Sequence, residues 1–306
     1  MFPVDTNLIL IRINKITGRG FDFHKIDVRD EKKLGRIFEG GNIDCIVHFA
    51  GLKAAGESVM RPIEYYSNNL GSTIALCQAM QKYGTKKIVF SSSACVYDAN
   101  NPMPLTEDGK TGDCSNPYGH TKHMSEQVLR CAANANKDWS VINLRYFNLV
   151  GAHESGEIGD DPTGIPQNLP PFLSQTAAGR HAFLNVWGDD YPTPDGSCIR
   201  DYIHVVDLVK GHVAAIKYAD KNPGEEAFNL GTGKGTSVLE FVKAFEDATG
   251  VKVPIRIANR REGDAAVSYC SPDKAQRMLG WKAKKTIAEG CMDMWKWQSK
   301  NPSGFK

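Results

Sequence analysis

The residues best suited to chemistry in this chain are a serine, a tyrosine and a lysine. Tyr118 precedes Lys122 by four positions, and Ser93 stands 25 positions before the tyrosine. Residues four apart on a helix project from one face, so the phenol and the amine can lie together. A phenol with a pKa of about 10 is a poor base at neutral pH, whereas a neighbouring ammonium favours the phenolate. We therefore predict a general acid/base unit for a hydroxyl proton, in which Lys122 lowers the pKa of Tyr118.

The segments around these residues indicate how they meet. The apolar run 87–90 predicts a buried strand that leads into Ser91, Ser92 and Ser93, and residues 118–136 predict a helix introduced by an Asn-Pro pair. In α/β enzymes, ligands bind at the carboxyl ends of the strands, where this serine can meet the helix. A Tyr-x-x-x-Lys pair alone recurs by chance, so the serine and the Asn-Pro pair make the pattern specific.

Strands and helices alternate through the first half of the chain. We predict strands at 20–26, 43–49 and 140–146 and helices at 31–38 and 62–83. This alternation indicates βαβ units and an α/β fold, a Rossmann-like doubly wound parallel sheet. The second half is richer in loops and predicts a smaller lobe, with loops at 151–171 and 189–197, helices at 204–218 and 238–249, and a strand at 227–230. We place a nucleotide-binding domain at 1–147 and the lobe at 148–306, with some interleaving.

Composition excludes several classes of function. The chain has 306 residues, 41% of them hydrophobic, and 37 basic against 35 acidic residues without a basic stripe, so we expect no nucleic-acid partner. It has no apolar run of about 18 residues, so we expect no membrane span, and its start does not resemble a signal peptide. Eight cysteines without a Cys-x-x-Cys pair suggest reduced thiols in a cytoplasmic protein. His120 and His123 lack a third ligand, so we expect no metal, and Cys95 suits a packed side chain better than a nucleophile.

Further motifs lead to a family. Together with the acid/base residues they resemble the extended short-chain dehydrogenase/reductases and, within these, the UDP-galactose 4-epimerases, from about residue 10 to the C-terminus. The matching segments are HFAGLK at 48–53, FSSSA at 90–94, LRYFN at 144–148, GIPQNL at 164–169, RDYIH at 200–204, RREGD at 260–264 and WKWQ at 295–298. The related nucleotide-sugar dehydratases carry an acidic pair near the position of Ala94 and Cys95, which this chain lacks.

The resemblance implies an isomerase of galactose metabolism that uses NAD to interconvert UDP-galactose and UDP-glucose. In such enzymes the tyrosine takes the proton of the sugar 4-hydroxyl while the C4 hydride passes to the nicotinamide. The 4-keto sugar then turns over, and the hydride returns to its other face. By this likeness Tyr118 is the base, Ser93 assists its proton transfer, and Lys122 also holds the cofactor ribose. The family further implies a homodimer that pairs the helices at 62–83 and 118–136.

The likeness also implies residues that bind each ligand. Asp27 would accept from adenine or simply end a turn, and Lys53 would face a phosphate or ribose or simply be solvated. Arg200 and Arg261 suit a pyrophosphate, although either could form a surface ion pair instead. The implied NAD site is Asp27, Val28, Phe49, Lys53, Asn68, Tyr118, Lys122 and Tyr146. The implied UDP-sugar site is Lys53, Tyr146, Phe147, Asn148, Gln167, Asn168, Leu169, Asn185, Val186, Trp187, Arg200, Arg261, Asp264 and Ser268.

Ser268 stands where this family has a residue that walls the sugar pocket. A tyrosine there accompanies exclusion of N-acetylated sugars, and a small residue accompanies their acceptance. We therefore predict that UDP-GlcNAc and UDP-GalNAc also enter.

The chain departs from the family at its start. A dinucleotide-binding fold needs a strand that runs into a glycine-rich turn at a helix N-terminus, and no such turn precedes residue 20. We expect that the first strand, this turn, the first helix and the second strand are missing, through an incomplete gene model, an alternative start or a degenerate copy, and that the edge of 43–49 is exposed. The apolar run 8–13 suits either a strand or, by the likeness, a helix. The alternative function is a non-catalytic UDP-sugar-binding remnant that cannot hold NAD.

Overall fold

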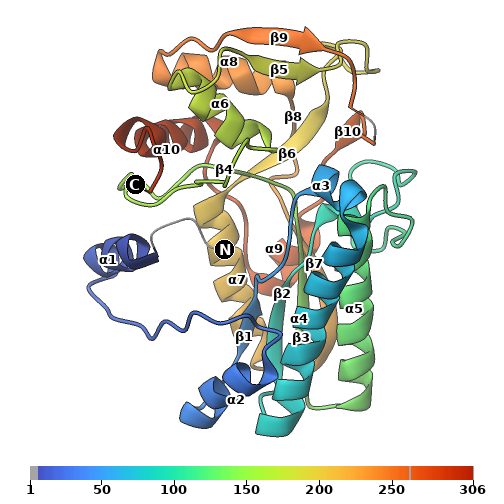
Figure 1. Ribbon diagram of the computed structural model, residues 1–306. Coiled ribbons are helices and arrows are strands. Elements are labelled where there is room, and N and C mark those ends of the chain that lie inside the picture. Colours follow the sequence, from blue (N-terminus) through green and yellow to red (C-terminus); the bar gives the residue numbers. More distant parts are fainter. Residues whose placement is uncertain (1–5, 262, 306) are drawn as a thin grey trace.

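A parallel sheet of four strands forms one half of the molecule (Figure 1). The computed structural model describes residues 6–261 and 263–305. Each neighbouring pair of strands is parallel, and the order across the sheet is β1 (Ile46–His48), β2 (Lys87–Ser91), β3 (Ser140–Tyr146) and β7 (Gly224–Leu230). The doubly wound α/β fold is thereby confirmed.

Helices cover both faces of this sheet, as the alternation of side chains along β2 shows. Ile88 and Phe90 pack against α4 (Pro62–Tyr83) and α5 (Pro117–Ala135). Val89, which points the other way, packs against α7 (Val205–Ala219) and α9 (Asp273–Leu279). Since both faces are covered, the strands carry the near-continuous apolar runs typical of parallel sheets.

The edge of β1 has no neighbour among the described residues other than β2. The predicted strand at 20–26 is wrong, because this segment forms no strand and its Phe21 and Phe23 are 50% and 48% exposed. Phe21 and Phe23 alternate as in a strand, but a strand needs a partner, and β1 does not reach this segment. The chain then enters α2 (Glu31–Gly40), whose N-terminus is capped by Asp30.

The run 8–13 belongs to a helix, α1 (Thr6–Thr17), which lies beside the lobe and away from the sheet (Figure 1). Arg12 fastens this helix. Its guanidinium donates to the Glu157 carbonyl and to Asn301 Oδ1, both at 2.8 Å, and lies over the rings of Trp297 and Phe305. Helix α1 thus joins the first residues described to the C-terminal end of the chain.

The second half builds the smaller lobe around a core of its own. One sheet contains β10 (Val267–Ser268), β6 (Ile199–His204), β4 (Asn148–Val150) and β8 (Gly235–Ser237), and β5 (Leu184–Trp187) pairs with β9 (Ile255–Ala258). Its helices are α6 (Leu169–Ala177), α8 (Val238–Thr249) and α10 (Ile287–Lys300). Because β7 pairs with β3 in the first sheet and α7 packs on a face of that sheet, the chain crosses between the two parts. No helix in the described ranges has the length and apolarity to span a bilayer.

Candidate active site

The acid/base residues lie where β2 ends and α5 begins. After β2, Ser93 adopts extended backbone and caps the short 3-10 helix η1 (Ala94–Val96) by accepting from Cys95 N at 3.2 Å. Asn116 caps α5 by accepting from Gly119 N at 2.9 Å, and Pro117 fits the first helical turn. Tyr118 N donates to the hydroxyl of Ser58, in α3 (Ala55–Met60), at 3.1 Å. These caps place the serine beside the first turn of the helix.

Lys122 approaches the same point from one turn further along α5. Its side chain is buried, and its Nζ donates to the Ser91 carbonyl at 2.6 Å. The amine is 4.8 Å from the ring centre of Phe90 and 5.9 Å from that of Tyr118. The structure therefore brings Ser93, Tyr118 and Lys122 together, as the spacing predicts.

The electrostatics of Tyr118 differ from the prediction. Burial raises the pKa of this phenol, and the nearby Cys95 raises it further, against a hydrogen bond from Ser93 that lowers it. The pKa of Tyr118 is therefore raised overall, and Lys122 is not among its largest influences, so the lowering by Lys122 stays a prediction. The Lys122 amine donates instead to the Ser91 carbonyl. Burial also lowers the pKa of Lys122 to about 8, and the nearby Cys95 and Glu126 oppose this shift.

Two aromatic residues of the implied NAD site gather beside this unit. Tyr146 ends β3, and its phenol shares a short hydrogen bond with the Ser91 hydroxyl. Phe49 follows β1 and is 54% exposed. Both rings lie near His212, at centre-to-centre distances of 6.0 Å for Tyr146 and 4.8 Å for Phe49. The carboxyl ends of β1, β2 and β3 thus share one edge, as parallel strands require.

The other residues implied for NAD are more dispersed. Asp27 lies in a turn and not at a strand end, and its ion pair with Arg29 at 2.6 Å contributes to a pKa of about 2. Val28 packs with the apolar cluster of α2 and α4, Asn68 is half-buried on α4, and Lys53 is exposed after β1. None of these positions tests the implied roles.

The next residue on α4, Asn69, escaped the sequence reasoning. It is buried, and its amide exchanges hydrogen bonds with the Leu52 backbone at 2.8 and 3.0 Å and donates to Thr121 Oγ1 at 2.9 Å. Asn69 thus ties the loop after β1 to α5. No apolar stretch surrounds Asn69 in the sequence, so no local signal marks it as buried.

The residues implied for the nucleotide meet in the lobe. Asp264 accepts from Arg261 Nε at 2.9 Å and lies 3.8 Å from Arg200, so two guanidinium groups share one carboxylate. The Arg261 guanidinium is 5.8 Å from the ring centre of Trp187, which is 39% exposed. Ser268 pairs with Arg200 in the β6–β10 register. Two cations, an acid and an aromatic ring therefore lie within one region.

Two side chains implied for the sugar nucleotide turn away from solvent. Val186 is completely buried in the lobe, because Leu184 and Val186 point inward on β5 while Asn185 and Trp187 alternate with them. The Val186 side chain therefore faces the interior of the lobe, and its implied place in the UDP-sugar site stays a prediction. Phe147 is buried in a cluster that includes Val96 and Leu105. Asn148 begins β4, and Gln167, Asn168 and Leu169 lead into α6.

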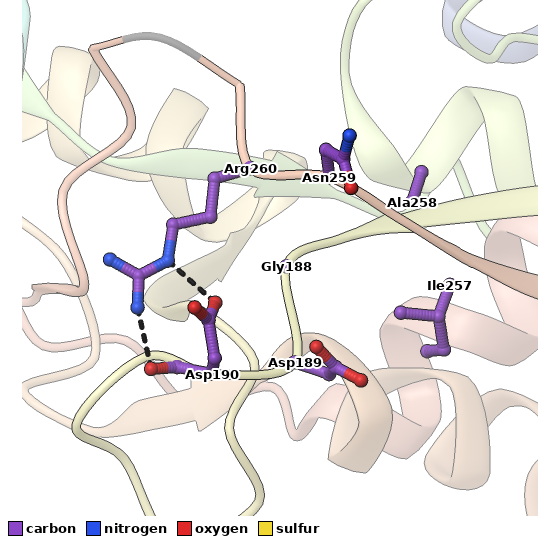
Figure 2. Close-up of a pocket in the computed structure, with 7 residues that line it drawn as sticks. All are labelled: Gly188, Asp189, Asp190, Ile257, Ala258, Asn259 and Arg260. Carbon is purple, nitrogen blue, oxygen red and sulfur yellow. Dashed lines mark hydrogen bonds and ion pairs between the residues drawn. The ribbon is translucent and has the colours of Figure 1, made fainter.

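A separate pocket of about 490 Å³ lies at the ends of β5 and β9 (Figure 2). Its wall includes Asp190, which binds Arg260 through its carboxylate at 2.6 Å and its carbonyl at 2.5 Å. Figure 2 shows the Arg260 side chain reaching from the segment after β9 to Asp190, in the segment after β5. None of the acid/base residues lines this pocket, so it does not contain the candidate chemistry.

Comparisons with known proteins agree with this geometry. A profile described as "NAD dependent epimerase/dehydratase family" matches residues 7–231. The UDP-glucose 4-epimerase of Bacillus subtilis (strain 168) is 53% identical over 297 residues, which is 97% of this chain and 87% of the relative. The enzyme of that name from Homo sapiens is 49% identical over 296 residues, covering 97% of this chain and 85% of the relative.

Solved structures agree as well. UDP-glucose 4-epimerase from Bifidobacterium longum in complex with NAD+ and UDP matches with a TM-score of 0.95 and 50% identity, covering 99% of this chain and 90% of that one. The enzyme from Stenotrophomonas maltophila with bound NAD and formylated UDP-arabinopyranose matches with a TM-score of 0.94 and 44% identity, covering 99% and 89%.

Proposed function

This chain belongs to the NAD dependent epimerase/dehydratase family, and we propose that it interconverts UDP-galactose and UDP-glucose by inverting C4 of the sugar. One observation carries this proposal: Ser93, Tyr118 and Lys122 converge at the end of β2 in a chain about half identical to UDP-glucose 4-epimerases. The reaction moves the proton of a sugar hydroxyl, for which a phenol, a hydroxyl and an amine are suitable groups.

The edge formed by β1, β2 and β3 fits the nicotinamide end of NAD. The Lys122 ammonium has three donors, of which the Ser91 carbonyl accepts one, and the half-exposed ring of Phe49 offers an apolar wall. Lys122, Tyr146 and Phe49 would hold this end, Lys53 and Asn68 the phosphates and ribose, and Asp27 and Val28 the adenosine. When bound, NAD supplies a hydride acceptor and donor.

The protein's own groups suit proton transfer at the phenol oxygen of Tyr118. Because burial raises its pKa, the Tyr118 phenolate, once formed, takes the proton of the sugar hydroxyl readily and can then return it to the sugar oxygen. Ser93 lies close enough to the phenol to lower its pKa and can pass the proton on, since a hydroxyl both donates and accepts. Lys122, at a pKa of about 8, remains charged at pH 7 and favours the phenolate when the proton leaves.

The lobe would hold UDP. Arg200 and Arg261 would release Asp264 in part to bind the pyrophosphate, and Asp264 would accept from the uridine ribose. Trp187 and Asn185, which point outward from β5, would contact the uracil. Phe147, Asn148, Gln167, Asn168 and Leu169 would surround the sugar. The small Ser268 would admit an N-acetyl group, so UDP-GalNAc and UDP-GlcNAc are further substrates.

The setting follows from the same proposal. The reaction serves galactose metabolism, and the eight free cysteines suit the reducing cytoplasm. Two chains would pair through α4 and α5, whose outer faces expose Ile63 by 79%, Ile74 by 43% and Met124 by 41%. Sedimentation or light scattering measures this pairing.

Turnover by the purified chain tests the proposal. We expect bound NAD in its absorbance and fluorescence and conversion of UDP-galactose to UDP-glucose. A Tyr118→Phe variant removes the proton-transfer oxygen and should abolish conversion. Tyr83→Phe is the matched control, because the Tyr83 hydroxyl donates to the exposed Glu39 at 2.9 Å, away from the acid/base residues. Equal rates in the two variants would refute the role of Tyr118, and UDP binding without NAD or turnover would favour a non-catalytic binding protein.

A further inference from the structure

A buried carboxylate lies one helical turn beyond the acid/base residues. Glu126 follows Tyr118 and Lys122 at four-residue spacing on α5, so the three side chains leave the same side of the helix. Its exposure is 0%. Glutamate is almost never fully buried without partners, so its contacts indicate what holds it there.

Two elements of the sheet bind this carboxylate. Glu126 Oε1 accepts from the Ser92 hydroxyl at 2.5 Å and from Arg145 Nε at 2.9 Å, and Oε2 accepts from Arg145 Nη2 at 2.7 Å. Arg145, on β3, also donates to the Tyr97 hydroxyl at 3.2 Å and to the Glu107 carbonyl at 3.3 Å. One carboxylate thus joins α5 to the end of β2 and to β3, in a charge-assisted network.

Because Ser92 is bound to Glu126, the positions of its neighbours Ser91 and Ser93 are also restrained. Its side chain continues the face of Ile88 and Phe90, which points to α5. The residue before it, Ser91, offers the carbonyl that accepts from Lys122, and the residue after it, Ser93, lies near the Tyr118 phenol. The distances within the acid/base unit therefore depend on where Ser92 is held.

The charge of Glu126 acts on Lys122 as well. The groups that face this amine are Tyr118 and Glu126 on α5, Cys95 on η1, His48 on β1, and the Phe90 ring and Ser91 carbonyl of β2. Burial lowers the pKa of His48 to about 3, so this imidazole is neutral. The Cys95 thiol has a pKa raised by burial and is also neutral at pH 7. Glu126 is then the charged group of this set that opposes the cost of burying the ammonium.

We infer that Glu126 is a positioning residue for the proposed epimerisation, on which this inference rests. Its carboxylate holds the Ser91–Ser93 backbone against α5, and its negative charge keeps Lys122 protonated. Glu126 touches neither sugar nor cofactor and acts through Ser92 and Lys122.

The first test replaces Glu126 by its neutral isostere. We expect Glu126→Gln to lower kcat about 100-fold, the effect of misplacing a catalytic group by about 1 Å, while KM for UDP-galactose stays unchanged. The alkaline limb of its pH profile should move to lower pH, because Lys122 loses its proton sooner. The control is Glu225→Gln, since Glu225 bonds Arg130 at 3.1 Å and Asn143 at 2.6 Å without contacting the unit. Equal kcat and equal alkaline limbs in the two variants would overturn the inference.

A second variant distinguishes the loss of positioning from a folding defect in Glu126→Gln. Glu126→Met combined with Arg145→Met removes both charges, and apolar replacement of a whole buried ion pair is often tolerated. Circular dichroism and thermal unfolding establish that the double variant is folded. We expect the same loss of kcat, because Ser92 then has no carboxylate to bind. Wild-type kcat in the folded double variant would contradict the positioning role.

A third measurement is independent of turnover. NMR of ε-13C-labelled lysine follows the titration of each amine, and a Lys122→Met sample assigns the signal. We expect Lys122 to titrate near pH 8 in the wild-type chain and at lower pH in Glu126→Gln. An unchanged titration would refute the electrostatic half of the inference. A wild-type chain that fails to convert UDP-galactose would refute the proposed function, and the titration would still decide the role of Glu126.

Discussion

Replacing Lys122 by methionine should stabilise the fold while abolishing activity. The ammonium is buried, and burial lowers its pKa from 10.5 to about 8. Such a shift corresponds to about 3 kcal/mol spent on holding the charged form in the folded state. Methionine avoids this cost, but it also loses the hydrogen bond to the Ser91 carbonyl, which destabilises the variant by about 1 kcal/mol. We therefore expect Lys122→Met to raise the free energy of unfolding at pH 7 by about 2 kcal/mol, with no turnover of UDP-galactose.

The pH dependence gives this prediction its sign. Because the folded pKa lies below the unfolded value, the unfolded chain binds more protons between pH 8 and 10.5, and wild-type stability rises across this window. The advantage of methionine is thus full below pH 8 and shrinks towards pH 10.5. Urea unfolding at pH 7 and pH 10 measures it, with Lys86→Met as the control for an exposed ion pair, to Asp138. A variant less stable than the wild type at pH 7, or an advantage independent of pH, would refute the reasoning.

Two further changes test other parts of the structure. Ser268→Tyr should fill the sugar pocket and remove turnover of UDP-GalNAc while retaining that of UDP-galactose, and equal loss or retention of both rates would count against a selective wall. Arg12→Ala removes two hydrogen bonds of 2.8 Å and two ring contacts, so we expect a loss of about 2 kcal/mol in unfolding free energy and faster proteolysis at 18–26. Unchanged cleavage would show that α1 is held by other contacts.

The long elements of the fold could be predicted because their signals are local. The ranges 62–83, 140–146 and 238–249 coincide with α4, β3 and α8. Gly84 ends α4 in the left-handed conformation, and Ser237 with Glu240 forms a capping box that starts α8. Each helix signal lies within a few residues of the boundary that it sets.

The short strands could not be predicted in the same way. Strand β10 has two residues and β5 has four, and each exists because a partner distant in the sequence pairs with it. The segment 20–26 is the opposite case. Its alternating Phe21 and Phe23 resemble a strand, but the segment pairs with no other strand among the described residues and forms none. Strand identity is decided by tertiary contacts that periodicity does not contain.

The candidate site divides along a similar line. Spacing predicts that Tyr118 and Lys122 share a helix face, but it does not reveal how deeply they are buried. Depth decides the electrostatics, because the same burial raises the pKa of the phenol and lowers that of the amine. As a result, the pKa of Tyr118 lies above that of Lys122, whereas an exposed tyrosine has a slightly lower pKa than an exposed lysine.

This inversion gives the surrounding polar groups their importance. An acid that holds its proton too tightly needs a partner that keeps its positive charge, and Lys122 at a pKa of about 8 keeps it at pH 7 by only a narrow margin. The Ser91 carbonyl of β2 and the Glu126 carboxylate of α5 both stabilise the charged form of Lys122. Changes that bury this site more deeply should therefore lower activity even where the fold stays stable. Deeper burial makes it easier for Lys122 to lose its charge, and the charged amine is the group that favours the phenolate.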